Sequence, residues 1–314
     1  MRVERSGDGT GNHSSRRLSA NPNMPEDWVV PKHRTKPVSS GDELAEEIEN
    51  TDIGRSEVGV CWLTQASWLL KFRSKTVLVD PWWRDLYAGD RWGKLLGEFP
   101  MSPEELPHID YVFCTHWHDD HICPDMLPRI AKLQPHTKFI VPLRSRKMLL
   151  DWGIPRGRIH SMRGNDSGEL PGGLTFFAIP AAHEELDTDE TGAHLYLGYL
   201  MHFDGMNVYH MGDSRPYPGW ENYVRRAAKM LNFDVDGEPT IDVAMLCING
   251  NDNLSHDEAV DFAVEMDVGL AIPMHYGMDP GNTVDPQIFV DEIEARGVDV
   301  EYMVPNPGEL VILG

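Results

Sequence analysis

The sequence is poor in basic residues, and lysine is especially scarce. Lysine and arginine together number 28, against 50 aspartates and glutamates, and the formal net charge is −22. Proteins that bind nucleic acid through a basic surface need clustered lysine and arginine to neutralise phosphates, so no nucleic-acid partner is expected. An acid-rich, lysine-poor surface suits a high-salt cytoplasm, although solubility alone explains it equally well.

Long apolar runs, cysteine pairs and a serine-hydrolase motif are also missing. No apolar stretch approaches the roughly 20 residues that a membrane-spanning helix needs. The polar N-terminus lacks the apolar core of a signal peptide, so we expect a cytoplasmic protein. The four cysteines form no CxxC pair, which favours buried free thiols over disulfides or a zinc knuckle. No G-x-S-x-G segment is present, so a serine nucleophile is unsupported.

The chain divides into a polar leader and one folded domain. Residues 1–37 are rich in Gly, Ser, Asn, Pro and Arg, which predicts a disordered or loosely docked leader, with Met24 as a second possible start. Residues 38–314 are expected to form a single domain, because the hydrophobic content of 41% supplies a sizeable core. Its strands and helices alternate in groups, as two mixed sheets with helices on both outer faces require.

The segment Thr115–His121 reads THWHDDH and concentrates potential metal ligands. The apolar run Tyr111–Cys114 precedes it and predicts a strand that delivers these donors onto one loop. Imidazole and carboxylate suit Zn, Mn or Fe, and such a group cannot be buried without neutralising partners. His116 and His118 share one face of an extended chain, and the following turn carries Asp120 and His121 to a second point. The motif therefore predicts ligands for two adjacent ions.

Three more candidate ligands follow directly on hydrophobic strands. A lone histidine at a strand end is usually a polar cap, but strand ends on one edge of a sheet converge in space, where sites are built. Seven such residues are hard to explain as caps. We expect one ion on His116, His118 and His183, a second on Asp120, His121 and His275, and Asp213 as the bridge.

Five residues are weaker candidates for support or substrate contact. Asp80 ends a buried strand, and it either supports the metal loop or starts a turn. His210 either stands behind the metal ligands or is an ordinary strand histidine. Arg215 either meets an anionic substrate group or forms a surface salt bridge. Asn251 and His256 either line the substrate mouth or belong to a polar loop and a helix start.

The THWHDDH motif and the strand ends that carry His183, Asp213 and His275 together resemble the metallo-β-lactamase-fold hydrolases, and within them the L-ascorbate-6-phosphate lactonase-like family. The resemblance runs from about Glu46 to the C-terminus. It also extends to N-acylphosphatidylethanolamine phospholipase D-like relatives, which share the Trp-Leu-x-x-Ala-Ser opening. The chain departs from the ascorbate-phosphate lactonases by having a histidine at position 183. The segments that carry the resemblance are CWLTQASWLLKF, VLVDPWW, VFCTHWHDDHI, VYHMGDS, IDVAMLCINGN and LAIPMHYG.

The resemblance implies an α/β fold, specifically a four-layer αββα sandwich of two mixed sheets flanked by helices. It implies two divalent ions, Mn or Zn with Fe as a third option, and hydrolysis by a metal-activated water that Asp120 orients and deprotonates. We expect a carboxylic ester hydrolase, namely a lactonase for a small anionic substrate such as a sugar-acid phosphate lactone. The family also suggests a homo-oligomer.

Two alternatives to a lactonase stay open. The first is a phosphodiesterase or N-acylphosphatidylethanolamine phospholipase D-like hydrolase that uses the same ions. The second is a non-catalytic metal-binding protein. Seven ligands with a bridging carboxylate argue against the second, because structural zinc sites usually close with four protein ligands around one ion.

Overall fold

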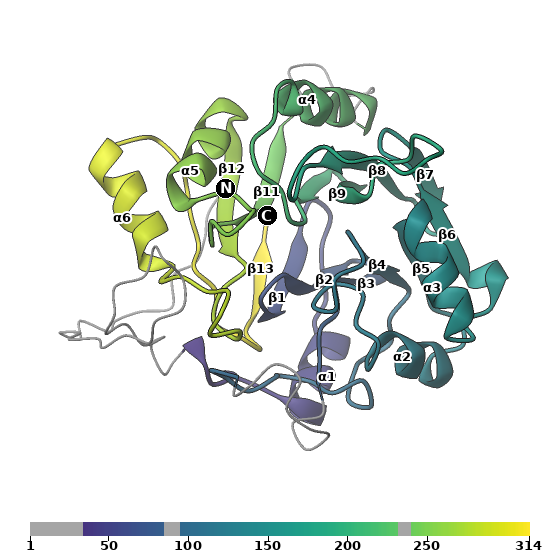
Figure 1. Ribbon diagram of the computed structural model, residues 1–314. Coiled ribbons are helices and arrows are strands. Elements are labelled where there is room, and N and C mark those ends of the chain that lie inside the picture. The colour runs from purple at the N-terminus through teal and green to yellow at the C-terminus, as the bar shows by residue number, and fades with distance from the viewer. Residues whose placement is uncertain (1–33, 85–94, 232–239) are drawn as a thin grey trace.

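Two mixed β-sheets pack face to face, and helices cover both outer faces (Figure 1). The computed structural model describes residues 34–84, 95–231 and 240–314. In these residues the layers follow the order helices, sheet, sheet, helices, so the predicted αββα architecture is confirmed.

Among the described residues, the first sheet has seven strands in the order β13-β1-β2-β3-β4-β5-β6. Neighbours from β13 to β3 run antiparallel, and neighbours from β3 to β6 run parallel. The strands are β1 (Val58–Thr64), β2 (Ser67–Phe72), β3 (Lys75–Val79), β4 (Tyr111–Phe113), β5 (Lys138–Pro142), β6 (Ile159–Met162) and β13 (Leu310–Leu313).

Strand β1 shows why the sheet is buried on both faces. Its side chains alternate in direction, as they must along a pleated strand. Val58, Val60 and Trp62 belong to the apolar cluster that includes the space between the sheets. Cys61 and Leu63 belong to the cluster under the outer helices. Because both faces are covered, the strand is apolar throughout instead of alternating with polar residues.

The second sheet has six strands within the described ranges, in the order β12-β11-β10-β9-β8-β7. Neighbours from β7 to β10 run antiparallel, and neighbours from β10 to β12 run parallel. The hairpin between β9 and β10 turns on Asp204 and Gly205, both with positive φ, as a two-residue turn of this kind requires. The strands are β7 (Ser167–Leu170), β8 (Leu174–Ala181), β9 (Tyr196–Phe203), β10 (Met206–His210), β11 (Ile241–Cys247) and β12 (Val268–Met274).

In the part of the chain that the structure describes, three α-helices lie outside each sheet (Figure 1). The first sheet is covered by α1 (Gly41–Asn50), α2 (Leu127–Leu133) and α3 (Arg146–Asp151), and short 3-10 turns lie at η2 (Leu143–Ser145) and η3 (Arg156–Arg158). The second is covered by α4 (Trp220–Leu231), α5 (His256–Glu265) and α6 (Gln287–Arg296). None of the helices in the described ranges is long and apolar enough to cross a membrane.

Most of the expected leader, including Met24, lies outside the described residues. Its described end contacts the domain. The carbonyl oxygen of Thr35 accepts a hydrogen bond from the backbone N–H of Glu98 at 2.9 Å. Arg34 lies 3.8 Å from the carboxylate of Asp285. Residue 38 stays our proposed start of a single domain.

Trp220 anchors α4 to the second sheet and gives a test of the packing. Its ring stacks on Phe262 of α5 with centroids 4.3 Å apart, and its Nε1–H donates to the hydroxyl of Tyr209 at 3.2 Å. Trp220→Ala would open a cavity, so we expect it to lower the free energy of unfolding by about 3–5 kcal/mol. Urea unfolding measures this. Met230→Ala on the same helix is 45% exposed and should change it by less than about 0.5 kcal/mol. A similar loss in both variants would contradict this account of the core.

Candidate metal centre

Seven side chains meet where strands from both sheets end. One group lies in the loop after β4 of the first sheet, and the others follow β8, β10 and β12 of the second. This is the edge at which the parallel strands present their carboxyl ends, where sites on layered α/β folds are usually found. The residues are His116, His118, Asp120, His121, His183, Asp213 and His275.

Their donor atoms form three overlapping sets, and within each set every pair of donor atoms lies within 4.8 Å. Asp213 is central: its carboxylate lies 3.4 Å from His121 Nε2, 3.7 Å from His183 Nε2 and 3.2 Å from His275 Nε2. The sets are His116, His118 and His183; His116, His121 and Asp213; and Asp120, His121 and His275. The structure therefore brings all seven residues together. Two of the three sets correspond to the two groups expected from the sequence, and the third joins His116 and His121, one from each group, through Asp213.

Two of these donors are buried without hydrogen-bond partners. Nε2 of His121 and Nε2 of His275 have none among the described residues, and both side chains are fully buried. Leaving a buried polar nitrogen unpaired costs free energy, so such atoms need an explanation. Each faces carboxylate oxygens at 3.2–3.7 Å. A divalent cation between them would satisfy both the nitrogens and the carboxylates, so the donor set fits a metal.

A buried carboxylate behind the motif orients two of the histidines. Asp80, fully buried after β3, accepts hydrogen bonds at 2.7 Å from His121 Nδ1 and from the backbone N–H and hydroxyl of Thr115. Because the Thr115 proton is directed at Asp80, its oxygen can accept from His116 Nδ1, which lies 3.1 Å away. Both rings then carry their proton on Nδ1 and leave Nε2 free, as metal-binding histidines require. Asp80 therefore does more than start a turn.

His183 and His275 follow strands of the second sheet, and residues outside those strands hold them in place. His183 Nδ1 lies 3.0 Å from two acceptors, the carbonyl oxygen of Asp252 and Oδ1 of Asn253, so its Nε2 is also left without a proton. The backbone N–H of His275 donates to the carbonyl oxygen of Gln65 at 3.1 Å. His275 has a φ of 67°, a left-handed conformation that a residue without a special role rarely adopts.

The charges in the cluster are strongly coupled. Burial lowers the pKa of His121 and of His275, but the neighbouring carboxylates outweigh burial and raise both pKa values, with Asp213 the largest contributor. Burial raises the pKa of Asp213, and His275 and His121 outweigh it, so that pKa falls well below its usual range. Burial and the neighbouring His121 lower the pKa of His116 well below its ordinary value. The centre is a buried cluster of opposite charges, which is stable only when each charge has a partner.

The cluster opens into a cavity of about 500 Å³. Six carboxylates line it, and neither lysine nor arginine is among the described lining residues. The mouth is therefore strongly acidic beyond the metal ligands themselves. The lining comprises Trp117, His118, Asp119, Asp120, His183, Glu184, Asp213, Asn251, Asp252, Asp279 and Asn282.

The structure places one of the three weaker candidates for substrate contact in the cavity lining and leaves the other two outside it. Asn251 lines the cavity and donates to Asn282 at 3.3 Å. Arg215 is not among the described lining residues, because its guanidinium pairs with the carboxylate of Asp252 at the rim. His256 is the first residue of α5 and is likewise absent from the described lining.

His210 lies away from the donor cluster and supports the backbone. It is fully buried at the end of β10, where its Nε2–H donates to the carbonyl oxygen of Ala66 at 2.9 Å. Its Nδ1 accepts from the backbone N–H of Gly212 at 3.2 Å. Both ring nitrogens are thus occupied, and the histidine holds the turn that presents Asp213.

Two residues at the site, Tyr196 and Gln65, were not predicted from the sequence. The ring of Tyr196, at the start of β9, lies 5.4 Å from those of His116 and His183 and 4.8 Å from that of Trp117. Gln65 accepts from the backbone N–H of Met278 at 3.0 Å and so fixes the segment after the last histidine. Neither residue stands beside a ligand in the sequence. The positive φ of Gln65, 46°, has no clear sequence signal.

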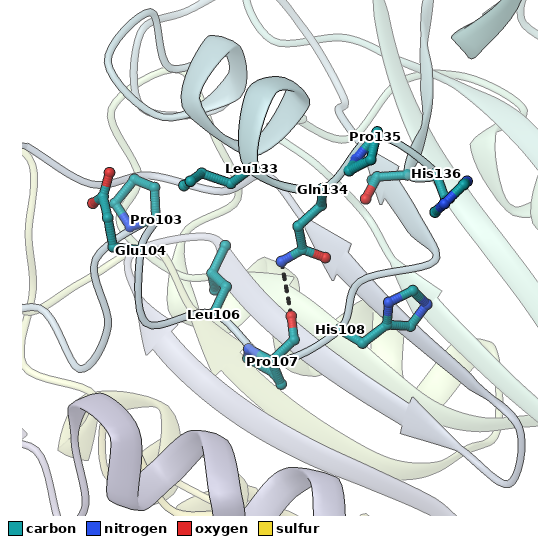
Figure 2. Close-up of a pocket in the computed structure, with 10 residues that line it drawn as sticks. Pro103, Glu104, Leu106, Pro107, His108, Leu133, Gln134, Pro135 and His136 are labelled. Atoms are coloured by element: carbon teal, nitrogen blue, oxygen red, sulfur yellow. Dashed lines mark hydrogen bonds between the residues drawn. The ribbon is translucent and has the colours of Figure 1, made fainter.

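A separate cavity of about 360 Å³ lies at the amino ends of strands β4 and β5, opposite to the ends that carry the donor cluster (Figure 2). It is formed by residues 103–108 before β4 and residues 133–137 before β5. Nε2 of Gln134 donates across it to the carbonyl oxygen of Pro107 at 2.9 Å. No set of metal donors occurs there among the described residues, so the candidate centre remains the cluster at the carboxyl ends of the strands.

Proteins that resemble this chain in sequence and in fold share its architecture and identify the family to which it belongs. The chain is 30% identical over 258 residues to a UPF0173 metal-dependent hydrolase of Archaeoglobus fulgidus, covering 80% of this chain and 96% of that protein. It is 25% identical over 270 residues to N-acyl-phosphatidylethanolamine-hydrolyzing phospholipase D 1 of Caenorhabditis elegans, covering 79% and 74%. Its fold resembles Igni18, a metallo hydrolase of Ignicoccus hospitalis, with a TM-score of 0.63 at 21% identity over 82% of this chain and 99% of that chain.

The family model described as "Beta-lactamase superfamily domain" matches residues 75–276, which contain all seven clustered donors. The match therefore covers strands β3 to β12 of the sandwich and the group of histidines and aspartates able to bind metal. The chain belongs to the β-lactamase superfamily domain family and is a metal-dependent hydrolase with the metallo-β-lactamase fold.

Proposed function

We propose that this hydrolase cleaves an ester-type bond in a small molecule, most concretely the bond of a lactone, at a centre of two divalent ions. The observation that carries the proposal is the seven-donor cluster, with its unpaired nitrogens, opening into a cavity of about 500 Å³. A structural site would be closed by its ligands, whereas a site for chemistry keeps access for water and substrate.

The residues divide between two ions as their contacts suggest. His116, His118 and His183 would hold one, and Asp120, His121 and His275 the other. Asp213, within 3.7 Å of histidines from both groups, would contact both ions. Mn and Zn both suit these nitrogen and oxygen donors, with Fe as a third option. When bound, such ions lower the pKa of a water towards neutrality and polarise the bond to be cleaved.

The side chain placed to handle the proton is Asp120. Its carboxylate is 21% exposed, lines the cavity and lies 3.6 Å from His275 Nε2. One side of this carboxylate therefore faces the donor cluster, and the other side faces the cavity and is open to water. We assign it the role of orienting the attacking water and accepting its proton, the work of a general base.

Asp80 would act through the histidines, not on the substrate. Asp80→Asn replaces the acceptor of His121 Nδ1–H by an amide and removes a charge, so we expect metal affinity to fall about 10- to 100-fold. Titration with Zn²⁺ in competition with a chelator measures the change. Asp110→Asn is a matched control, because its carboxylate pairs with Lys75 at 2.7 Å and is outside the donor sets. Equal affinity in the Asp80 variant and the wild type would remove Asp80 from the proposed centre.

The proposal is tested by a substrate screen on protein reloaded with its own metal. We expect turnover of simple γ-lactones that is lost on chelation and restored by the metal. Bis(4-nitrophenyl) phosphate is run in parallel to separate the second candidate. Two bound ions with no turnover of any lactone, ester or phosphodiester would favour a non-catalytic metal-binding protein and overturn the proposal.

A phosphodiesterase of the phospholipase D type is the second candidate. It is supported by the similarity to N-acyl-phosphatidylethanolamine-hydrolyzing phospholipase D 1 over 79% of the chain. The same ions would serve it, because a phosphorus centre can replace the carbonyl carbon as the target of water. Turnover of the phosphodiester without turnover of lactones would select this candidate.

The acidic lining of the cavity limits where the anionic group of a sugar-acid phosphate can bind. Its rim carries carboxylates, and Arg215 is already paired with one of them. An anionic group placed against that rim would be repelled. We therefore propose that only the scissile bond enters the metal cavity and that any charged part of the substrate lies elsewhere. A cytoplasmic location and a homo-oligomer remain predictions.

A further inference from the structure

A second pocket adjoins the metal cavity through one shared wall. It has a volume of about 390 Å³ and is lined by Trp117, Arg144, Ser145, Lys147, Met148, Asp151 and Trp152. Trp117 lines both spaces, and it stands between two of the proposed ligands in the sequence. The pocket therefore begins where the metal cavity ends.

The topology explains this placement. Strands β4 and β5 are parallel neighbours, so the loops after them lie side by side at one edge of the sheet. The loop after β4 carries Trp117 and the donors, and the turn after β5 runs through η2 into α3. Ligands of α/β sheets bind outside the carboxyl ends of such strands. This pocket shares that edge with the donor cluster, whereas the cavity of Figure 2 lies at the opposite ends of the same strands.

The pocket differs from the metal cavity in charge and polarity, because it has basic and apolar side chains where the cavity has carboxylates. Its floor is mainly apolar, with half-buried Trp117, Met148 and Trp152. Its cations are Arg144 and Lys147. Lys147 pairs with Asp151 at 2.5 Å, which leaves Arg144 as the cation of this pocket with no carboxylate partner among the described residues.

Arg144 is held in place without being neutralised. Its guanidinium lies over the ring of Trp117, with Cζ 4.8 Å from the centroid. The ring of Trp117 in turn lies 4.8 Å from that of Tyr196. Stacking fixes the plane of a guanidinium and leaves its N–H edge available for an anion. The side chain is exposed, so a ligand in the pocket can reach it.

We propose that this pocket is a substrate subsite that takes a flat aromatic or apolar group carrying a negative charge. The scissile bond then lies at the metal centre, and the rest of the molecule passes over Trp117 to reach Arg144. The division matches the charges around the two spaces, because the carboxylates at the rim of the metal cavity repel an anion and Arg144 in the neighbouring pocket attracts it. The inference rests on the proposed hydrolase function, of which it names the substrate class.

The test uses the metal-loaded, full-length protein and two probes of nearly equal shape. 2-Naphthalenesulfonate is an aromatic anion, and methyl 2-naphthyl sulfone, which has no acidic N–H, is its neutral counterpart. Isothermal titration calorimetry measures both dissociation constants. We expect the wild type to bind the anion at least about tenfold more tightly, the contribution of one charge-assisted hydrogen bond. Arg144→Gln should abolish that preference, and Trp152→Ala should weaken both probes.

A matched control is available elsewhere on the surface. Arg129 stacks on Trp83 with Cζ 4.6 Å from the ring centroid, in the same manner as Arg144 on Trp117, but it is not part of the pocket lining. Arg129→Gln should leave both affinities unchanged. Equal binding of the two probes by the wild type, no binding of either, or the same loss in both arginine variants would each overturn the subsite.

Failure of the subsite can be told apart from failure of the proposed function. Probe binding involves no turnover, so a protein that hydrolyses lactones but shows no preference for the anion refutes the subsite alone. A protein with the predicted preference and no hydrolysis of any substrate refutes the proposed function. Because Arg144 is exposed, its substitution leaves the core intact, and unfolding measurements on both arginine variants verify this.

Discussion

Asp213→Asn is expected to remove nearly all activity. The Asp213 carboxylate lies within 3.7 Å of His121, His183 and His275, so it contacts histidines assigned to both ions. The amide removes the charge that would join the two ions, and the stabilisation supplied by the centre amounts to several kcal/mol. We expect kcat/KM to fall by at least about 10³-fold and the metal content to drop from two ions per chain to below one. Steady-state kinetics and elemental analysis measure the two effects.

The control for this change is Asp252→Asn. Asp252 lines the same cavity, but its side chain pairs with Arg215 and it is not in the donor sets. Its φ of 63° is one that asparagine adopts readily, so the exchange keeps the loop. Asp252→Asn should retain both ions. If Asp213→Asn kept its metals and turnover, the bridging role would be wrong.

Asp120→Asn is expected to separate catalysis from binding. Asparagine keeps an oxygen near the position of a ligand atom but cannot accept a proton. Removing a general base lowers kcat by about 10²- to 10⁴-fold, and KM should change little because substrate binding is not removed. Kinetics under saturating metal, so that ion loss does not contribute, measure this split.

The neighbouring Asp119 gives the comparison. It lies in the same loop and lines the same cavity, but it does not belong to any of the three donor sets. Asp119→Asn should therefore leave kcat close to that of the wild type. A variant pair in which both aspartates, or neither, lowered kcat strongly would show that Asp120 does not have the assigned role.

The layered fold and the donor cluster were predictable because strong local signals mark them. Four donors within THWHDDH, and one donor after each of three apolar strands, leave few arrangements in which these side chains do not meet. The hairpin at Asp204-Gly205 and the capping box formed by Ser255 and Glu258 are equally local, and both are present. Local chemistry and global topology agree at these positions, as they do in sequences that specify one structure.

What the sequence could not predict depends on distant contacts. Strand β7 is largely exposed and polar, so it has no apolar pattern to reveal it, and it forms only by pairing with β8. Tyr196 reaches the histidines only because β9 pairs with β8 and the backbone N–H of the next residue, Leu197, donates to the carbonyl oxygen of Thr115. Arg215 was a reasonable candidate for an anion, but a carboxylate 37 residues away in the sequence occupies it. Each case needs the positions of two segments, and neither segment alone contains that information.

Seven residues holding two ions can be observed by anomalous diffraction from crystals of the metal-loaded protein, collected at the absorption edge of its metal. We expect two peaks. One should lie among His116, His118 and His183, and the other among Asp120, His121 and His275, with Asp213 in contact with both. A single peak, no peak, or ions bound away from these side chains would contradict the proposed centre.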